Sequence, residues 1–196
     1  MPKPRIVILA GPNGAGKTTA AKYLLTEAFG IVEFVNADTI AAGLSAYAPE
    51  TVAFEAGRVM LLRIEALLRA KKSFAFETTL SSKSFARLMP RAREAGYLVT
   101  LIYVALPSAA LAKRRVAKRV KNGGHSIPEE VIARRFTCSL RNLVVRYRAL
   151  ADEWFVYDNS DSKPPTLIAG GTDKTTTVVE ERKWQRLVML AEQAQK

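Results

Sequence analysis

Short apolar runs alternate with longer stretches of helical pattern along the whole chain. The runs are nearly continuous and rich in β-branched residues, which is typical of parallel strands buried on both faces. We predict strands at residues 4–10, 31–35, 73–76, 97–106 and 154–158. Helices are predicted at residues 17–30, 51–71, 82–96, 108–122 and 129–150, with a last helix ending at about residue 195. This alternation predicts an α/β fold with a mostly parallel central sheet flanked by helices.

The remaining features predict one compact, intracellular unit. Residues 164–180 are predicted to form either a short hairpin or a loop that caps a nucleotide. The length of 196 residues and the 48% apolar content predict a single domain over residues 1–196. No segment approaches the roughly 18 apolar residues of a membrane span, and no signal-type stretch begins the chain. The lone Cys138 cannot form an internal disulfide. We therefore expect a cytoplasmic location without a membrane partner.

A glycine-rich segment, GPNGAGKTT at residues 11–19, follows the first predicted strand and opens the first predicted helix. Its spacing fits GxxxxGK[ST], the P-loop, in which backbone N–H groups surround phosphates at a helix N-terminus. Lys17, expected as an exposed loop lysine, would reach the β- and γ-phosphates, and the Thr18 hydroxyl would ligate Mg²⁺. The expected nucleotide-binding residues are Gly11, Pro12, Asn13, Gly14, Ala15, Gly16, Lys17, Thr18 and Thr19.

The chemistry of this segment predicts ATP as co-substrate and Mg²⁺ as cofactor. The sequence contains no NKxD-type guanine signature, which favours ATP over GTP. His125 is the single histidine. A multi-histidine metal site is therefore excluded, and a metal must be held by carboxylate, hydroxyl and phosphate oxygens, which suits Mg²⁺.

Two carboxylates follow predicted strands, where ligands gather in a parallel α/β sheet. Asp38 comes just after the second strand and Glu77 just after the third. Phosphoryl transfer to an alcohol needs a carboxylate that accepts the hydroxyl proton near the γ-phosphate, and we predict Asp38 as this base. The alternative is that Asp38 caps a helix N-terminus. Glu77 is expected to bind an acceptor, to hold Mg²⁺ through water, or to cap the following segment.

Most of the net charge of +12 comes from residues 113–148, which contain eleven Lys or Arg and two Glu and so contribute a net charge of +9. This stretch contains two basic helices joined by KNGGHS, which predicts a mobile lid over about residues 113–136 whose arginines close over phosphates. Arg119 and one of Arg134 or Arg135 are the expected inward cations, and Arg115 is a further candidate. The alternatives are a nucleic-acid footprint and a solvated helix face.

The motifs GPNGAGKTT, NAD, ETTL, RVAKRV and GGHSIPEEVIARRF, in this order, resemble the zeta toxin family of P-loop kinases over about residues 5–160. The resemblance is to its chromosomal branch in particular. Characterised members transfer the γ-phosphate of ATP to the 3′-hydroxyl of UDP-N-acetylglucosamine, and a separate antitoxin protein restrains them. The resemblance thus implies an ATP-dependent kinase with an alcohol acceptor and an antitoxin partner.

The resemblance also implies roles for individual residues. Lys17 and Thr18 match the Walker lysine and its Mg²⁺-binding neighbour, and Asp38 matches the proposed general base. Glu77 and Thr79 fall where the acceptor is held. Arg119 and Arg134 match catalytic lid arginines. The segment ETTLSSKS lacks the basic residue expected soon after the glutamate in the toxin branch. This departure argues against a UDP-sugar as the acceptor.

Together these features predict an ATP-dependent small-molecule kinase. One competing hypothesis is a polynucleotide or RNA-end kinase, in which the basic stretch binds nucleic acid. Another is an ATP-binding switch module that changes shape without phosphorylating an acceptor.

Overall fold

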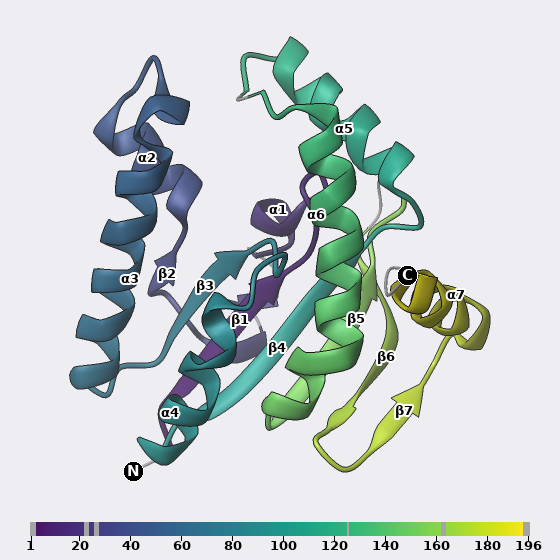
Figure 1. The fold of residues 1–196 in the computed structure, drawn as a ribbon. Helices are drawn as coiled ribbons and strands as arrows, with labels where there is room; N and C mark the ends of the chain where they lie inside the picture. Colours follow the sequence, from purple (N-terminus) through teal and green to yellow (C-terminus); the bar gives the residue numbers. More distant parts are fainter. Residues whose placement is uncertain (1–2, 22–23, 26–27, 125, 162–163, 194–196) are drawn as a thin grey trace.

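Seven strands form one sheet in the order β2-β3-β1-β4-β5-β6-β7 in the computed structural model (Figure 1). The structure describes residues 3–21, 24–25, 28–124, 126–161 and 164–193. Strands β1 to β5 pair in parallel, whereas β6 and β7 add to one edge as an antiparallel extension. The predicted α/β fold with a mostly parallel sheet is therefore confirmed.

The strands lie close to the predicted positions, but β3 runs further than predicted, so Glu77 lies within this strand and not just after it. Their bounds are β1 (Arg5–Ala10), β2 (Phe34–Val35), β3 (Phe74–Thr78), β4 (Leu98–Ala105), β5 (Glu153–Asp158), β6 (Thr166–Thr172) and β7 (Thr176–Val178). The edge strand β2 is shorter than expected, because only its last two residues pair with β3. Residues 164–180 contain the β6–β7 hairpin, so the hairpin interpretation of this segment is the correct one.

Helices flank the sheet, and one of them was not predicted. The bounds are α1 (Lys17–Ala21), α2 (Ala37–Leu44), α3 (Ala53–Arg69), α4 (Leu88–Glu94), α5 (Ala109–Lys121), α6 (Glu129–Asn142) and α7 (Glu181–Gln193). The unpredicted helix is α2, which is only eight residues long; its apolar residues recur at helical spacing, but only Ala41 is buried.

Several predicted helices are interrupted or shifted at their ends. The helix predicted at 51–71 begins with the 3-10 turn Pro49–Val52, and the one predicted at 82–96 begins with the 3-10 turn Ser84–Ala86. The second basic helix ends its α-helical part at Asn142 and continues as a π-helical and a 3-10 turn to Leu150. Parts of the predicted helices at 17–30 and near residue 195 lie outside the described residues.

Two helical arms rise beyond the carboxyl ends of the central strands (Figure 1). The α2–α3 arm, which comprises α2, α3 and the turn between them, stands next to β2. The α5–α6 hairpin stands on the other side of α1, and its two helices pack on each other. The loop after β1 enters α1 between these arms, so the arms enclose the place where ligands bind in such sheets. None of the described helices is long and apolar enough to span a membrane.

Candidate active site

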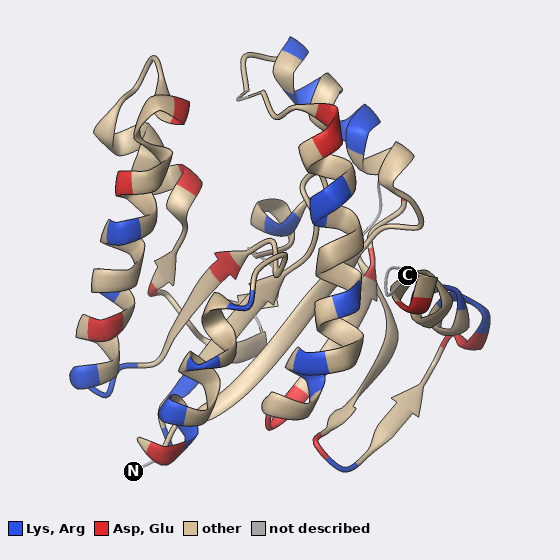
Figure 2. Cartoon of the chain, in the orientation of Figure 1, with Lys and Arg blue, Asp and Glu red and all other residues tan. Residues whose placement is uncertain are grey.

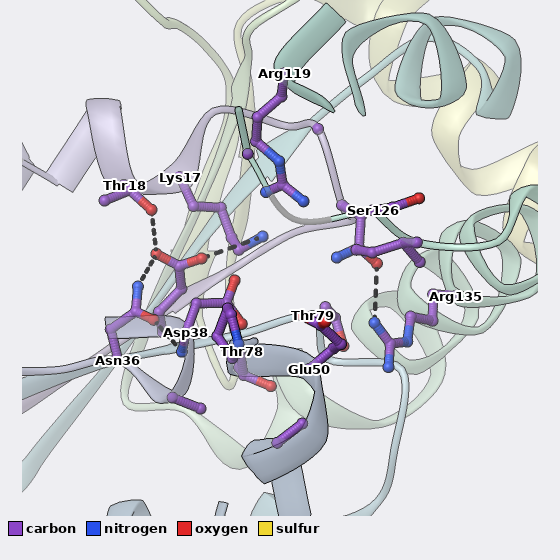
Figure 3. Close-up of a pocket in the computed structure, with 18 of the residues that line it drawn as sticks. Lys17, Thr18, Asn36, Asp38, Glu50, Thr78, Thr79, Arg119, Ser126 and Arg135 are labelled. Carbon is purple, nitrogen blue, oxygen red and sulfur yellow. Dashed lines mark hydrogen bonds and ion pairs between the residues drawn. The ribbon is translucent and has the colours of Figure 1, made fainter. Parts of the chain in front are cut away.

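A cavity of about 1370 Å³ opens between the P-loop, the α2–α3 arm and the α5–α6 hairpin (Figure 3). The strands β2 and β3 contribute their carboxyl ends to its wall through Asn36, Asp38 and Glu77. Sites for one small ligand usually measure about 300–1000 Å³. The cavity therefore has room for a nucleoside triphosphate and a second small molecule.

The glycines of the P-loop are required by close packing against two other segments. Gly14 and Gly16 have φ angles of 76° and 79°, in the left-handed region that favours glycine. A Cβ atom on Gly14 would lie 2.7 Å from the carbonyl oxygen of Ala112 in α5, and one on Gly16 would lie 2.6 Å from the side-chain nitrogen of Asn159. The loop is thus held between α5 and the segment that follows β5.

Asn159, which the sequence analysis did not identify, packs against the P-loop and hydrogen-bonds to it. Its side-chain amide donates a hydrogen bond to the carbonyl oxygen of Ala15 at 2.7 Å. The guanidinium of Arg115 donates to the carbonyl oxygens of Asn159 and Ser160 at 2.7 and 2.8 Å. Arg115 therefore ties α5 to the same segment. The only signal in the sequence was a polar segment directly after a buried strand, at the edge of the sheet where ligands bind.

Lys17 is buried, with a side chain only 7% exposed, contrary to the expectation of an exposed loop lysine. Its ammonium donates to the carbonyl oxygen of Pro12 at 3.2 Å and lies 3.5 Å from a carboxylate oxygen of Glu77. Burial lowers the pKa of Lys17 below its usual value, while Glu77 and Asp38 oppose this shift and Arg119 adds to it. A phosphate group bound here would favour the charged ammonium in the same way as the carboxylates.

Glu77 bridges the P-loop and the end of β2. One of its carboxylate oxygens accepts hydrogen bonds from the Thr18 hydroxyl and from the side-chain amide of Asn36, both at 2.9 Å (Figure 3). A hydroxyl beside a carboxylate offers the hard oxygen ligands that Mg²⁺ prefers. The described residues contain no cluster of three or more His, Cys, Asp or Glu that could hold a metal alone. The residues present therefore fit an Mg²⁺ ion shared with bound phosphates, and this geometry favours the Mg²⁺ interpretation of Glu77.

Asp38 lies in the first turn of α2 and lines the cavity. The residue that caps this helix is Asn36, whose side-chain oxygen accepts from the backbone N–H groups of Asp38 and Thr39 at 2.8 and 3.3 Å. The alternative that Asp38 itself is the cap is therefore wrong. The structure leaves its carboxylate at the cavity wall, on the same side as Glu77. Thr79 also lines the cavity, and its hydroxyl hydrogen-bonds that of Ser81 at 2.8 Å.

Three arginines of the α5–α6 hairpin line the cavity, namely Arg115, Arg119 and Arg135. One of Arg134 and Arg135 was predicted to point inward; Arg134 is exposed on α6 and is not among the described lining residues, so the structure favours Arg135 over the match to Arg134 that the resemblance implied. The reason is helical geometry: Arg134 is two residues from both Ile132 and Phe136, which are buried, and it therefore points to the opposite face. Arg135 donates to the side-chain oxygen of Asn13 in the P-loop at 3.4 Å. His125, the single histidine, lies outside the described residues.

The neighbouring arginines Arg134 and Arg135 provide a matched test of this placement. We expect Arg135→Ala to lower kcat for ATP turnover by about 10- to 100-fold while changing the Kd for ATP by less than about threefold. Arg134→Ala, which removes the same charge from the outer face, should change both constants by less than about twofold. Steady-state kinetics and nucleotide titration measure the two effects. A larger loss in Arg134→Ala would contradict the placement.

The strand order and the P-loop define a P-loop protein of the α/β class. A family model described as an AAA domain matches residues 6–137, and the chain belongs to this family. An uncharacterized protein of Haemophilus influenzae is 30% identical over 132 residues, which cover 67% of this chain and 92% of that protein.

Solved structures show the same fold, and one of them comes from a toxin-antitoxin system. One is a chain of the PezAT chromosomal toxin-antitoxin system of Streptococcus pneumoniae, with a TM-score of 0.67 and 16% identity over 100% of this chain and 89% of that one. Another is the AvrRxo1-ORF1:AvrRxo1-ORF2 complex with sulphate ions, with a TM-score of 0.74 and 18% identity over 94% of this chain. This chain spans 63% of that longer chain, which has also been solved with ATP. The predicted likeness to zeta-toxin-type P-loop kinases is therefore confirmed at the level of the fold.

Proposed function

We propose that the protein is an ATP- and Mg²⁺-dependent phosphotransferase that transfers the γ-phosphate of ATP to a hydroxyl group of a small molecule. The observation that carries this proposal is the cluster of Lys17, Glu77 and Thr18 at the P-loop, with the Asp38 carboxylate in the wall of the same cavity. A site for hydrolysis alone would not need the space for a second substrate. The cavity volume of about 1370 Å³ supports two-substrate chemistry.

In this proposal each residue acts on a defined step. The Asp38 carboxylate accepts the proton of the acceptor hydroxyl, whose oxygen attacks the γ-phosphorus as the bond to the β-phosphate oxygen breaks and ADP leaves. Lys17, Arg119 and Arg135 stabilise the charge on the transferring group. Thr18 and Glu77 would hold Mg²⁺ against the phosphates, where the ion neutralises charge.

The α5–α6 hairpin, at about residues 113–136, would act as the lid. Its connecting turn includes Gly123, whose φ angle of 83° requires glycine or strain. Closure would bring Arg119 and Arg135 onto the phosphates and exclude water. In this proposal residues 1–196 form one domain. Use of ATP is consistent with a cytoplasmic location.

The resemblance to zeta toxins makes a UDP-N-acetyl sugar an acceptor to test and a separate antitoxin protein a partner to look for. A second candidate function is a polynucleotide or RNA-end kinase. It is favoured by the outward basic residues of the α5–α6 hairpin, which carries dense positive charge (Figure 2). Its hallmark would be oligonucleotide affinity that falls steeply with salt.

Labelled ATP tests the proposal directly. The protein is incubated with γ-labelled ATP, Mg²⁺ and a small-molecule extract of cells, and the products are separated from inorganic phosphate. We expect a labelled organic phosphate that forms only with Mg²⁺ and not with Lys17→Ala. A labelled oligonucleotide in a parallel reaction would instead support the RNA-end kinase. An ATP-dependent change in shape without any labelled product would support the switch module.

A further inference from the structure

The loop that follows β3 forms part of the cavity wall beside the P-loop. Thr78, the last residue of β3, pairs with Ala10, the last residue before the P-loop. The chain therefore leaves the sheet next to the phosphate site and continues as the 79–83 loop. Thr79, which Figure 3 shows, and Ser82 line the cavity. The loop thus lies where an acceptor would approach the γ-phosphate.

The backbone of the 79–83 loop has a conformation that its own sequence does not favour. Leu80 has a φ angle of 57°, in the left-handed region that residues with side chains rarely adopt. Leu80 is buried, and its backbone N–H donates to the Thr78 hydroxyl at 3.1 Å. Such a conformation persists only when the surrounding structure holds it. The loop therefore needs contacts from another part of the chain.

Two residues at the far end of the second basic helix, Asn142 and Tyr147, supply these contacts. The Asn142 amide donates to the carbonyl oxygen of Leu80 at 2.8 Å and, more weakly, to that of Ser82 at 3.5 Å. The Tyr147 hydroxyl donates to the carbonyl oxygen of Ser82 at 2.9 Å. Burial raises the pKa of Tyr147, so its hydroxyl stays protonated and able to donate. Neither residue is among the described lining residues, so both act on the loop from outside the cavity.

The π-helical turn Leu143–Tyr147 brings the two residues of this clamp to the same side of the helix. In an α-helix, residues five apart point about 140° away from each other. In a π-helix, hydrogen bonds join residues five apart, so five residues make roughly one turn. Here the Arg148 N–H donates to the carbonyl oxygen of Leu143 in this way. Turns of this kind are rare and are frequently found at functional sites.

The helix that carries the clamp also contacts the phosphate site. Asn142 is seven residues, or about two turns, from Arg135, so both side chains lie on one face of α6. Arg135 lines the cavity and donates to the side-chain oxygen of Asn13 in the P-loop at 3.4 Å. One helix therefore places an arginine at the phosphates and holds the loop beside them.

We infer that Asn142 and Tyr147 are positioning residues for the phosphate acceptor. By holding the backbone of the 79–83 loop, they direct Thr79 and Ser82 to the acceptor and align its hydroxyl with the γ-phosphorus. This inference rests on the proposed kinase function and adds that α6 aligns both substrates. A displacement of about 1 Å at a reacting group can cost about 100-fold in rate. Water needs no such alignment by the loop, so it attacks the γ-phosphorus more often when the clamp is lost.

The partition of phosphate between acceptor and water tests this inference. Each protein is incubated with γ-labelled ATP, Mg²⁺ and a small-molecule extract of cells, and labelled organic and inorganic phosphate are both measured. We expect Asn142→Ala and Tyr147→Phe to lower the ratio of organic to inorganic phosphate by about tenfold, while the Kd for ATP changes by less than about twofold. Loss of folded protein would lower both products equally, so the ratio separates positioning from stability.

Tyr103→Phe and Arg141→Ala are the matched controls for these variants. Tyr103 is fully buried and its hydroxyl hydrogen-bonds that of Ser139 at 2.8 Å, but neither residue is among the described lining residues. Arg141 is exposed on α6 next to Asn142. Both controls should keep the ratio within about twofold of the wild-type value. A ratio that falls as far in Tyr103→Phe as in Tyr147→Phe would overturn the inference.

Limited digestion with trypsin tests the clamp without an acceptor. Lys83, exposed at the end of the loop, offers a cleavage site that mass spectrometry of the fragments identifies. We expect cleavage after Lys83 to be about three- to tenfold faster in Asn142→Ala and Tyr147→Phe than in Tyr103→Phe. Unchanged cleavage would show that other contacts hold the loop, and it would overturn the inference.

The outcomes separate this inference from the proposed function. Faster cleavage after Lys83 with an unchanged phosphate ratio would overturn the inference and leave the kinase function standing. No labelled organic phosphate from a wild-type protein that binds ATP would overturn both.

Discussion

Lys17→Ala is expected to lower ATP turnover by about 1000-fold or more, the largest effect of any single substitution in the site. The Lys17 ammonium is buried beside Glu77 and Asp38, and its burial lowers its pKa. An anion at this position would be shielded from water, so its interaction with the ammonium is stronger than on the surface. Lys17 is the single Lys or Arg among the described P-loop residues that line the cavity, so no neighbour within the loop can replace the lost charge.

The fold should survive this substitution. Glu77 keeps the hydrogen bonds from Thr18 and Asn36 when Lys17 is removed, although it loses the buried cation that pairs with it. We therefore expect the free energy of unfolding to fall by about 1 to 3 kcal/mol, which leaves a folded protein with a single melting transition. Lys118→Ala, on the exposed surface of α5, is the control and should retain normal turnover. Near-normal turnover in a folded Lys17→Ala protein would refute the P-loop assignment.

Asp38→Asn is expected to lower phosphoryl transfer by about 100- to 10,000-fold while the Kd for ATP changes by less than about threefold. Asparagine has nearly the same shape as aspartate but cannot take the hydroxyl proton. Because Asn36 caps α2, the substitution does not remove a cap, and the melting temperature should stay nearly unchanged. Single-turnover transfer to the identified acceptor and a nucleotide titration measure the two quantities.

Asn36→Ala is the complementary control for Asp38→Asn. It removes the cap of α2 and the hydrogen bond to Glu77, so it should lower the free energy of unfolding by about 1 kcal/mol or more. A protein in which Asp38→Asn retains full transfer would show that another group, or no group, accepts the proton. The pair of variants thus separates a chemical role at residue 38 from a structural role at residue 36.

The chain's local patterns were sufficient for the strands and for the phosphate site. The apolar runs predicted β1, β3, β4 and β5 because strands buried on both faces need continuous apolar sequence. The P-loop was evident from its spacing because its glycines, lysine and threonine act within nine consecutive residues. Placing Asp38 and Glu77 at one edge followed from the parallel arrangement of the strands that precede them.

Tertiary structure decided what depends on residues far apart in the chain. The eight-residue helix α2 buries only Ala41 fully, and its packing against α3, which begins nine residues later, stabilises it. Arg135 rather than Arg134 faces the cavity because α6 is oriented by the packing of Ile132 and Phe136. The hydrogen bond from Asn159 to the P-loop joins residues 144 positions apart. The cavity likewise depends on tertiary structure, since its lining residues come from the P-loop and from two arms that are far apart in the sequence.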